Sequence, residues 1–256
     1  MSALVKDYFH RLSTGCKKWE LAIWWFFRIV MIAGLIESYV NMGNYEDKIR
    51  TSMIVNIVCC FGWEIFQAFP KNHLFRYLPC SFQNVTSVYI FLTAFMGAYV
   101  NWYYEVWWWD KSLHFVAGGL LVFVGYAMVK AYETRDKMMI PVTVTVFAAF
   151  CTSFMFGVFW ECFEFTFDQF FDGDTQHWSY ILAEEANNLT LIFQPDEVYH
   201  SQDWFARFAL IDTMSDIVLN TAGAIICGII LKVALHKKEK AERAAAVAGV
   251  KETIKA

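Results

Sequence analysis

Residues 111–132 read KSLHFVAGGLLVFVGYAMVKAY, and this stretch decides the class of the fold. It contains no Asp, Glu, Lys or Arg from residue 112 to residue 129. An apolar run of about 18 residues or more is long enough for an α-helix to cross the hydrocarbon core of a bilayer. The stretch therefore predicts a transmembrane helix.

Five further stretches have the same character, and their approximate boundaries are 19–41, 51–69, 84–104, 139–171 and 206–231. The chain is 57% hydrophobic and only 18% charged, whereas about a quarter of the residues in soluble domains are charged. A soluble protein of this length would have to bury several very long helices in one core. We therefore predict an all-α fold, a polytopic integral membrane bundle of six transmembrane helices.

Lys and Arg residues are distributed unevenly over the connections between these stretches. Three connections carry only four of them, whereas sixteen lie in the alternate segments 1–18, 70–83, 130–138 and 232–256. Cytoplasmic loops carry an excess of Lys and Arg. The asymmetry predicts a multi-pass protein of the plasma or inner membrane with both termini in the cytoplasm. Residues 1–235 are expected to form a single bundle domain, and 236–256 a charged cytoplasmic tail.

The one long connection covers residues 172–208 and is predicted to be extracytoplasmic. It combines many acidic side chains with aromatic and aliphatic ones. Long loops of this kind are often functional. We expect this segment to lie on the outer interface or to fold over the helix ends as a lid.

The seven cysteines show no CxxC spacing, and most of them fall inside apolar runs. This pattern disfavours a disulfide framework or a zinc ribbon. We expect them to be buried thiols that behave as small hydrophobic groups.

Three predicted spans carry polar residues at helical spacing, so that the residues of each set share one face. They are Asp110 and His114 in the span at 111–132, Glu161, Glu164 and Asp168 in the span at 139–171, and Asp212, Asp216 and Asn220 in the span at 206–231.

The predicted topology brings these three sets to a similar depth. At about 1.5 Å per residue, His114 lies roughly 6 Å below the outer end of its helix, Glu164 about 10 Å and Asp216 about 12 Å. A charged group at the centre of a membrane helix costs on the order of 2.5–3.5 kcal/mol to insert. Lys111, Arg207 and a protonated His114 are the expected counter-charges, and they are outnumbered by the acids. The excess of carboxylates favours a bound cation.

The leading hypothesis is a divalent metal site in the outward-facing half of the bundle. The expected ligands are His114, Glu161, Glu164 and Asp216. An oxygen-rich set with one imidazole suits Mg²⁺, Mn²⁺, Zn²⁺ or Fe²⁺, and residue types do not choose among them. Three residues are expected to support the ligands: Asp110, Lys111 and Asn220.

This site predicts a metal-dependent enzyme that acts on an envelope lipid or a lipid-linked substrate. Either Asp212 or Asp168 would serve as the general base. No nucleic-acid partner is expected, and the oligomeric state is left open. Three alternatives stay open as well: an ion- or proton-coupled transporter, a non-catalytic binder of a lipid or antibiotic, and a structural network of protonated acids.

Other residues of the predicted spans receive simpler interpretations. Five glycines are expected to allow close helix packing rather than to bind phosphate: Gly118, Gly119, Gly157, Gly223 and Gly228. We expect Glu64 to pair with a nearby base, and Arg28 to pair with Glu37 or a lipid headgroup.

Two motifs resemble those of the VanZ-like superfamily of bacterial membrane proteins. Asp110-Lys111-x-x-His114 is similar to the DKxxH element of that family. Asp216-x-x-x-Asn220-x-x-Gly223-Ala224 is similar to its later DxxxNxxGA element. The resemblance covers about residues 110–228, and it implies a setting in the cell envelope, where VanZ-like proteins are linked to glycopeptide resistance.

Two departures bring the chain closer to the uncharacterised YjdF-type inner-membrane proteins. Glu161-x-x-Glu164 stands where VanZ-like proteins have an acidic residue followed by Gln, and no Arg shortly precedes the DxxxN element. YjdF-type proteins pair an ExxE with a later DTxxD, here Asp212-Thr213-x-x-Asp216. The resemblance to these proteins implies the motif positions and no reaction.

Overall fold

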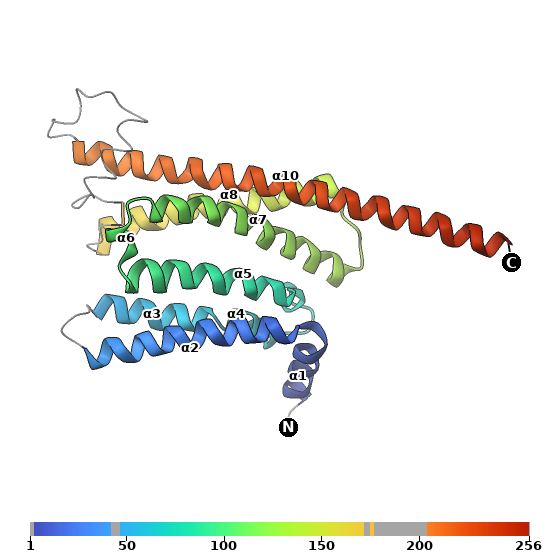
Figure 1. Cartoon of the computed structure of the whole chain (residues 1–256), viewed down its shortest axis with the longest axis horizontal. Helices are drawn as coiled ribbons and strands as arrows, with labels where there is room; N and C mark the ends of the chain where they lie inside the picture. The colour runs from blue at the N-terminus through green and yellow to red at the C-terminus, as the bar shows by residue number, and fades with distance from the viewer. Residues whose placement is uncertain (1–2, 42–46, 172–174, 177–203, 256) are drawn as a thin grey trace.

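The computed structural model of the chain describes residues 3–41, 47–171, 175–176 and 204–255, and no β-strand occurs among them (Figure 1). The first half comprises α1 (Ala3–Gly15), α2 (Lys18–Val40), α3 (Asp47–Cys59), α4 (Gly62–Gln67), the 3-10 helix η2 (Leu74–Tyr77), α5 (Cys80–Ile90) and the π-helix η3 (Phe91–Tyr99). The second half comprises α6 (Trp102–Glu105), α7 (Trp109–Asp136), α8 (Val142–Phe171) and α10 (Trp204–Lys255). The predicted all-α class is confirmed for the described residues.

Four helices are long and apolar enough to cross a membrane, and they are Lys18–Val40, Trp109–Asp136, Val142–Phe170 and Phe208–Ala246. They coincide with four of the six predicted spans. The predicted spans at 51–69 and 84–104 are instead built from shorter consecutive helices. The described structure therefore supports four uninterrupted spans, and six crossings stay a prediction.

The span predicted at 51–69 is interrupted between α3 and α4, at Cys60 and Phe61. The break leaves the Cys60 carbonyl without a helical N–H donor. Side chains of two neighbouring helices donate hydrogen bonds to it instead. Arg28 donates to it from Nε at 3.1 Å and from Nη2 at 2.6 Å, and Gln83 Nε2 donates at 2.7 Å. Non-helical backbone at membrane depth is tolerated where protein groups satisfy it in this way.

Arg28 is 1% exposed and also pairs with Glu64, with its Nη2 2.7 Å from Oε1. The prediction that Glu64 pairs with a base is confirmed. The predicted pairing of Arg28 with Glu37 was wrong, because Glu37 instead accepts a hydrogen bond from the Tyr99 hydroxyl.

The span predicted at 84–104 changes its helical type and then ends early. After α5 the chain continues as η3, in which Val100 N–H donates to Phe95 O at 2.8 Å. Asn101 then takes a left-handed conformation with φ of 71°. Asn is one of the few residues that adopt this conformation readily, and it turns the chain into α6 before α7 begins.

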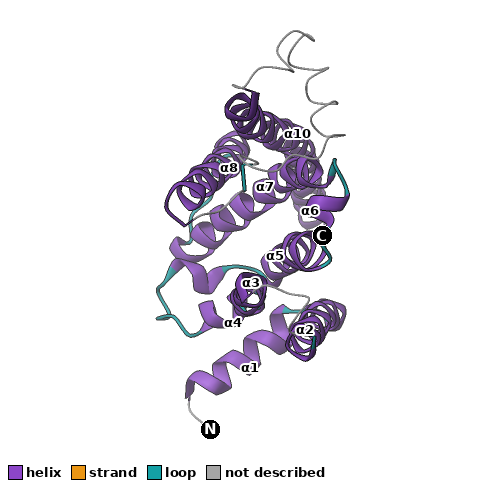
Figure 2. Cartoon of the chain, turned by 90° about the vertical axis from the view of Figure 1, so that its left-hand side faces the viewer, coloured by secondary structure: helices purple, strands orange, loops and turns teal. Residues whose placement is uncertain are grey.

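The helices pack as two groups side by side, one of α2 to η3 and one of α7, α8 and α10 (Figure 2). Buried apolar side chains of the second group include Val122, Ala149, Ala224 and Leu231. Those of the first group include Met31, Cys60 and Ala94. The candidate site belongs to the second group.

Close approach of α7, α8 and α10 depends on glycine. A Cβ added at Gly118 would lie 1.9 Å from Asn220 O, and one added at Gly223 would lie 2.0 Å from Phe115 O. The predicted packing role is therefore confirmed for these glycines, and also for Gly119 and Gly157, where an added Cβ would meet a neighbour at 2.8 and 2.3 Å. It was wrong for Gly228, where an added Cβ meets no atom within 4 Å.

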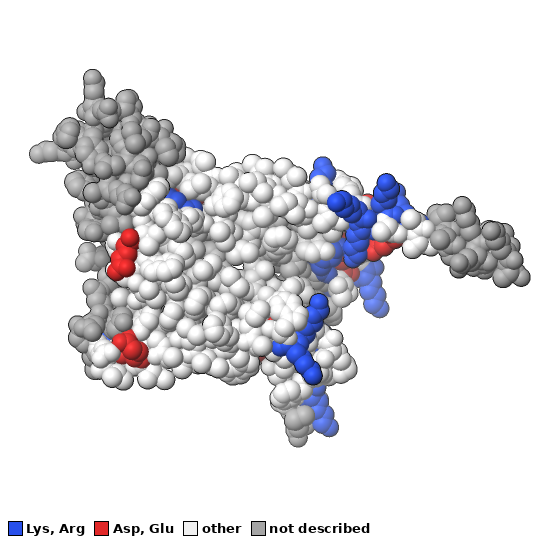
Figure 3. Space-filling model, viewed as in Figure 1, with Lys and Arg blue, Asp and Glu red and all other residues white. Residues whose placement is uncertain are grey.

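Lys and Arg side chains gather at one end of the bundle, where α1 lies across the helices and α10 projects (Figures 1 and 3). This end is called the basic end below. The tail predicted at 236–256 continues α10 as far as Lys255 without a break. At the same end Arg76 pairs with Asp7 and so holds η2 against α1.

One pair of cysteines corrects the expectation of isolated thiols. Cys16 at the end of α1 and Cys80 at the start of α5 form a disulfide, with their Cα atoms 5.5 Å apart. The sequence separation of 64 residues gives no signal of this contact. The bond fastens α1 to the bundle at the basic end.

Candidate functional site

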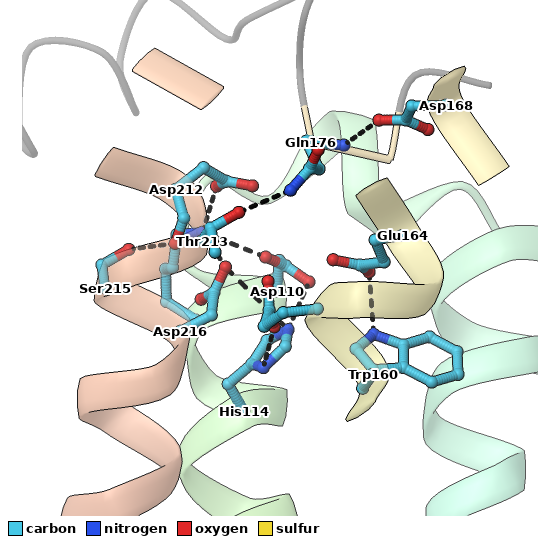
Figure 4. Close-up of polar contacts among 12 residues, drawn as sticks. Asp110, His114, Trp160, Glu164, Asp168, Gln176, Asp212, Thr213, Ser215 and Asp216 are labelled. Atoms are coloured by element: carbon cyan, nitrogen blue, oxygen red, sulfur yellow. Dashed lines mark hydrogen bonds and ion pairs between the residues drawn. The ribbon is translucent and has the colours of Figure 1, made fainter. Parts of the chain in front are cut away.

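Three helices place polar side chains at one point in the half of the bundle remote from the basic end (Figures 1 and 4). The first turns of α7 carry Asp110 and His114, and the last third of α8 carries Glu164 (Figure 4). Asp212 and Asp216 extend toward them from the start of α10. The structure thus brings together most of the residues that the sequence singled out.

Lys111 lies at the centre of this cluster and is only 7% exposed. Its Nζ contacts Asp212 Oδ1, lies 2.8 Å from Asp216 Oδ2, and lies 3.1 Å from Asp110 Oδ2. The lysine therefore bridges α7 and α10 by charge-assisted hydrogen bonds, which are stronger than neutral ones. From the sequence, Lys111 is among the residues predicted to support the ligands, whereas the structure places its ammonium group at the centre of the cluster.

His114 faces carboxylates through both ring nitrogens. Nε2 lies 3.6 Å from Asp110 Oδ1 and 4.0 Å from Asp216 Oδ2. Nδ1 lies 3.5 Å from Glu161 Oε1 on α8. The imidazole thus stands between an aspartate pair on one side and a glutamate on the other.

Several buried oxygen atoms of the cluster have no hydrogen-bond donor among the described residues. They are both carboxylate oxygens of Glu161, Oδ1 of Asp216 and Oδ1 of Asn220. Glu161 is 4% exposed and Asp216 is 1% exposed. A buried acceptor without a donor costs about 1–3 kcal/mol, and more if it is charged. These atoms point to a ligand or to protons that would satisfy them.

Asp110, His114 and Asp216 each offer one donor atom, and the three atoms lie within 4.8 Å of one another. Bonds from divalent metals to nitrogen and oxygen ligands are about 2.0–2.6 Å long. Donors on opposite sides of one ion are then separated by about twice that length. The three groups therefore fit around one ion with small adjustments of their side chains.

The charges of the cluster do not balance within the described residues. Five carboxylates converge there: Asp110, Glu161, Glu164, Asp212 and Asp216. The described basic groups in contact with them are Lys111 and His114. The geometry accordingly accommodates further positive charge, as a cation or as protons on the acids.

Glu164 is held one turn along α8 from Glu161, and its Oε1 accepts a hydrogen bond from Trp160 Nε1 at 2.8 Å (Figure 4). Trp160 was not singled out in the sequence. Its spacing of four residues from Glu164 places the two on one face of a helix, and this spacing is the signal that could have identified it.

Asp168 stands apart from the cluster, at the end of α8. Its carboxylate accepts hydrogen bonds from Thr175 N–H at 2.8 Å, from the Thr175 hydroxyl at 2.7 Å and from Gln176 N–H at 2.8 Å. Gln176 Nε2 then donates to Thr213 Oγ1 on α10 at 2.6 Å. Asp168 thus fixes a bridge from α8 to α10, and neither Gln176 nor Thr213 carried a sequence signal for this role.

Asn220 lies one turn below Asp216, at the crossing of the three helices. A Cβ added at Gly157 would lie 2.3 Å from its Nδ2. Asn220 therefore fills the space that Gly118 and Gly157 leave open. The predicted lid at 172–208 lies outside the described residues, apart from Thr175, Gln176 and the first turns of α10.

The comparisons with known proteins cover the chain to different extents. The family model described as "Predicted membrane protein (DUF2238)" matches residues 23–238. An uncharacterized protein of Thermotoga maritima is 32% identical over 80 residues, which cover 31% of this chain and 40% of that protein. No solved structure matches the chain.

Proposed function

The chain belongs to the DUF2238 family of predicted membrane proteins. From the geometry of the acidic cluster we propose that it is a divalent-metal-dependent enzyme of the cell envelope. Its substrate would be an envelope lipid or a lipid-linked molecule reached from within the bilayer. The observation that carries the proposal is the convergence of Asp110, His114 and Asp216 beside buried carboxylate oxygens that have no described donor.

The ligand set differs from the one expected from sequence. Asp110, the Nε2 of His114 and Asp216 would bind the ion, since their donor atoms lie within reach of one point. Glu161 faces the opposite nitrogen, Nδ1. Histidine ligands commonly donate this second N–H to a carboxylate, which fixes the orientation of the ring. Glu161 would therefore orient His114, and Glu164 would add negative charge one turn away.

A bound divalent ion would polarise a phosphoryl oxygen or activate a water molecule. Lys111 holds Asp212 and Asp216 in position on α10. Asp212 is the better placed of the two predicted general bases, because it lies within the cluster. Asp168 lies at the end of α8, where its carboxylate accepts hydrogen bonds from Thr175 and Gln176. Proton transfer to Asp212 requires that Lys111 shift toward Asp110 or Asp216.

The membrane setting of the proposal includes six crossings, with α3–α4 and α5–η3 as the two interrupted ones. Both termini and the basic end would face the cytoplasm, in accord with the excess of Lys and Arg there. The site would then lie in the outer leaflet, as in the envelope setting implied by the resemblance to YjdF-type and VanZ-like proteins. In a reducing cytoplasm Cys16 and Cys80 would be adjacent thiols rather than a disulfide.

The protein purified in detergent should retain about one divalent metal ion per chain, because a site of this kind binds by several charged ligands at once. His114→Ala and Asp216→Ala should each lose it, as measured by elemental analysis. Asp168→Ala is the matched control, an acid on the same bundle outside the proposed ligand set, and should retain the metal. Metal-free wild-type protein of unchanged fold and activity would refute the proposal and favour a structural network of acids.

Glu161→Gln should weaken metal binding by about 10- to 100-fold, the usual effect of losing a carboxylate that orients a histidine ligand. The measurement is a competition titration with a chelator of known affinity. Glu133→Gln on α7, an acid at the basic end, serves as the control. An unchanged affinity in Glu161→Gln would remove Glu161 from the site.

A further inference from the structure

A second feature of the bundle lies far from the acidic cluster, between α8 and α10 near the basic end. It is a groove of about 280 Å³ with an almost entirely apolar lining. Its residues include Thr143, Phe147 and Phe150 from α8 and Ala224, Gly228 and Lys232 from α10. We propose that this groove binds one acyl chain of an anionic phospholipid, whose phosphate pairs with Lys232.

Gly228 borders open space in this groove. An added Cβ there meets no atom within 4 Å, in contrast to Gly118 and Gly223, where α7 and α10 are in direct contact. From Lys232 to Ala224 the groove follows α10 for about 12 Å toward the membrane interior. This shape is long, narrow and apolar, as an extended hydrocarbon chain requires.

Positive charge marks the end of the groove at the basic end. Lys232 is exposed, and among the described residues no carboxylate lies within 4.0 Å of it. The acids on the next turns of α10 are already engaged, since Glu239 pairs with His236 and Arg243. Lys232 is therefore available to an anion from outside the protein.

The start of α8 adds to this attraction. Thr143 stands in the first turn of α8 and also lines the groove. The first turn of a helix presents N–H groups without intrahelical partners and the positive end of the helix dipole. A phosphate beside Lys232 would thus meet an ammonium group and a helix N-terminus together. Basic pockets between transmembrane helices on the cytoplasmic side are typical sites for anionic headgroups.

The test compares lipids added to the full-length protein in a neutral detergent. Phosphatidylglycerol should be retained in native mass spectra and should raise the melting temperature, whereas phosphatidylcholine of the same chain length should do so at least about fivefold less effectively. Inorganic phosphate alone should have no effect, because the groove holds the chain. Equal effects of the two lipids, or an equal effect of inorganic phosphate, would overturn the proposal.

Two variants locate the site. Lys232→Gln should reduce the preference for phosphatidylglycerol to near that for phosphatidylcholine, and Gly228→Leu should abolish retention of both by filling the groove. Lys237→Gln, an exposed lysine farther along α10, should behave as the wild type. Retention that is unchanged in Lys232→Gln would refute the proposal. The proposal would also be refuted if the wild type formed a dimer that takes up no lipid and that Gly228→Leu dissociates. A second copy of the chain, and not a lipid, would then cover the groove.

Discussion

Replacement of Lys111 by methionine should lower the free energy of unfolding by about 3–5 kcal/mol, the usual cost of removing one partner from a buried ion pair. Methionine keeps most of the unbranched stem but removes the ammonium group that contacts Asp110, Asp212 and Asp216. Two nearly inaccessible carboxylates on α10 then lose their counter-charge. The measurement is thermal or denaturant-induced unfolding of the purified protein in detergent.

Lys130→Met is the matched control, since it removes a lysine from the same helix. The Lys130 side chain is 39% exposed and pairs with Glu133 three residues along. Such exposed pairs contribute about 0–1 kcal/mol. Equal destabilisation by the two variants would show that the central contacts of Lys111 do not stabilise the fold.

The same variant separates the metal hypothesis from a structural network of acids. A divalent ion between Asp110, His114 and Asp216 would supply the charge that Lys111→Met removes. Added Mn²⁺ should therefore raise the melting temperature of Lys111→Met by more than that of the wild type. If Mn²⁺ stabilises neither protein, the carboxylates of the cluster are neutralised by protons or by Lys111 without a metal ion. The proposal of a metal-dependent enzyme would then be wrong.

Gly118→Ala should destabilise the protein by about 3 kcal/mol or more, at the upper end of the range for overpacked cores. The new Cβ would lie 1.9 Å from the backbone oxygen of Asn220, which no side-chain rotation relieves. The helices α7 and α10 must then move apart, and His114 moves away from Asp216. The variant should lose its metal as well as its stability, as measured by unfolding and elemental analysis.

Gly228→Ala provides the contrast, because the added methyl group meets open space. Alanine favours helix over glycine by up to about 1 kcal/mol, so this variant should be neutral or slightly stabilised. Similar destabilisation by both substitutions would mean that helix approach at Gly118 is looser than the structure describes.

The sequence predicted the uninterrupted spans well, because each of them is a single long apolar run. It did not predict the break between α3 and α4, since Cys59, Cys60 and Phe61 continue the apolar pattern. The break depends on Arg28 and Gln83, whose side chains replace the helical partner of the Cys60 carbonyl. Contacts between segments this far apart leave no local trace in the sequence.

The candidate site was predictable as a set of residues but less so in its arrangement. Helical spacing and depth placed the acids of α7, α8 and α10 at one level. Spacing alone could not show that Lys111 turns inward to three of them, or that Asp168 is occupied by Thr175 and Gln176. These assignments depend on side-chain direction and on the path of the chain beyond α8.

The interrupted helix also bears on how the protein is made. Arg28 alone would be costly to pass into lipid, and the short α3, with its unsatisfied carbonyl at Cys60, would be a poor insertion signal by itself. The Arg28 side chain donates hydrogen bonds to the Cys60 carbonyl, and Glu64 supplies the counter-charge for Arg28. The two segments are therefore expected to leave the translocon together as one hairpin. A chain arrested when α2 has reached the translocon but Cys60 is still inside the ribosome should keep its first helix at the lateral gate.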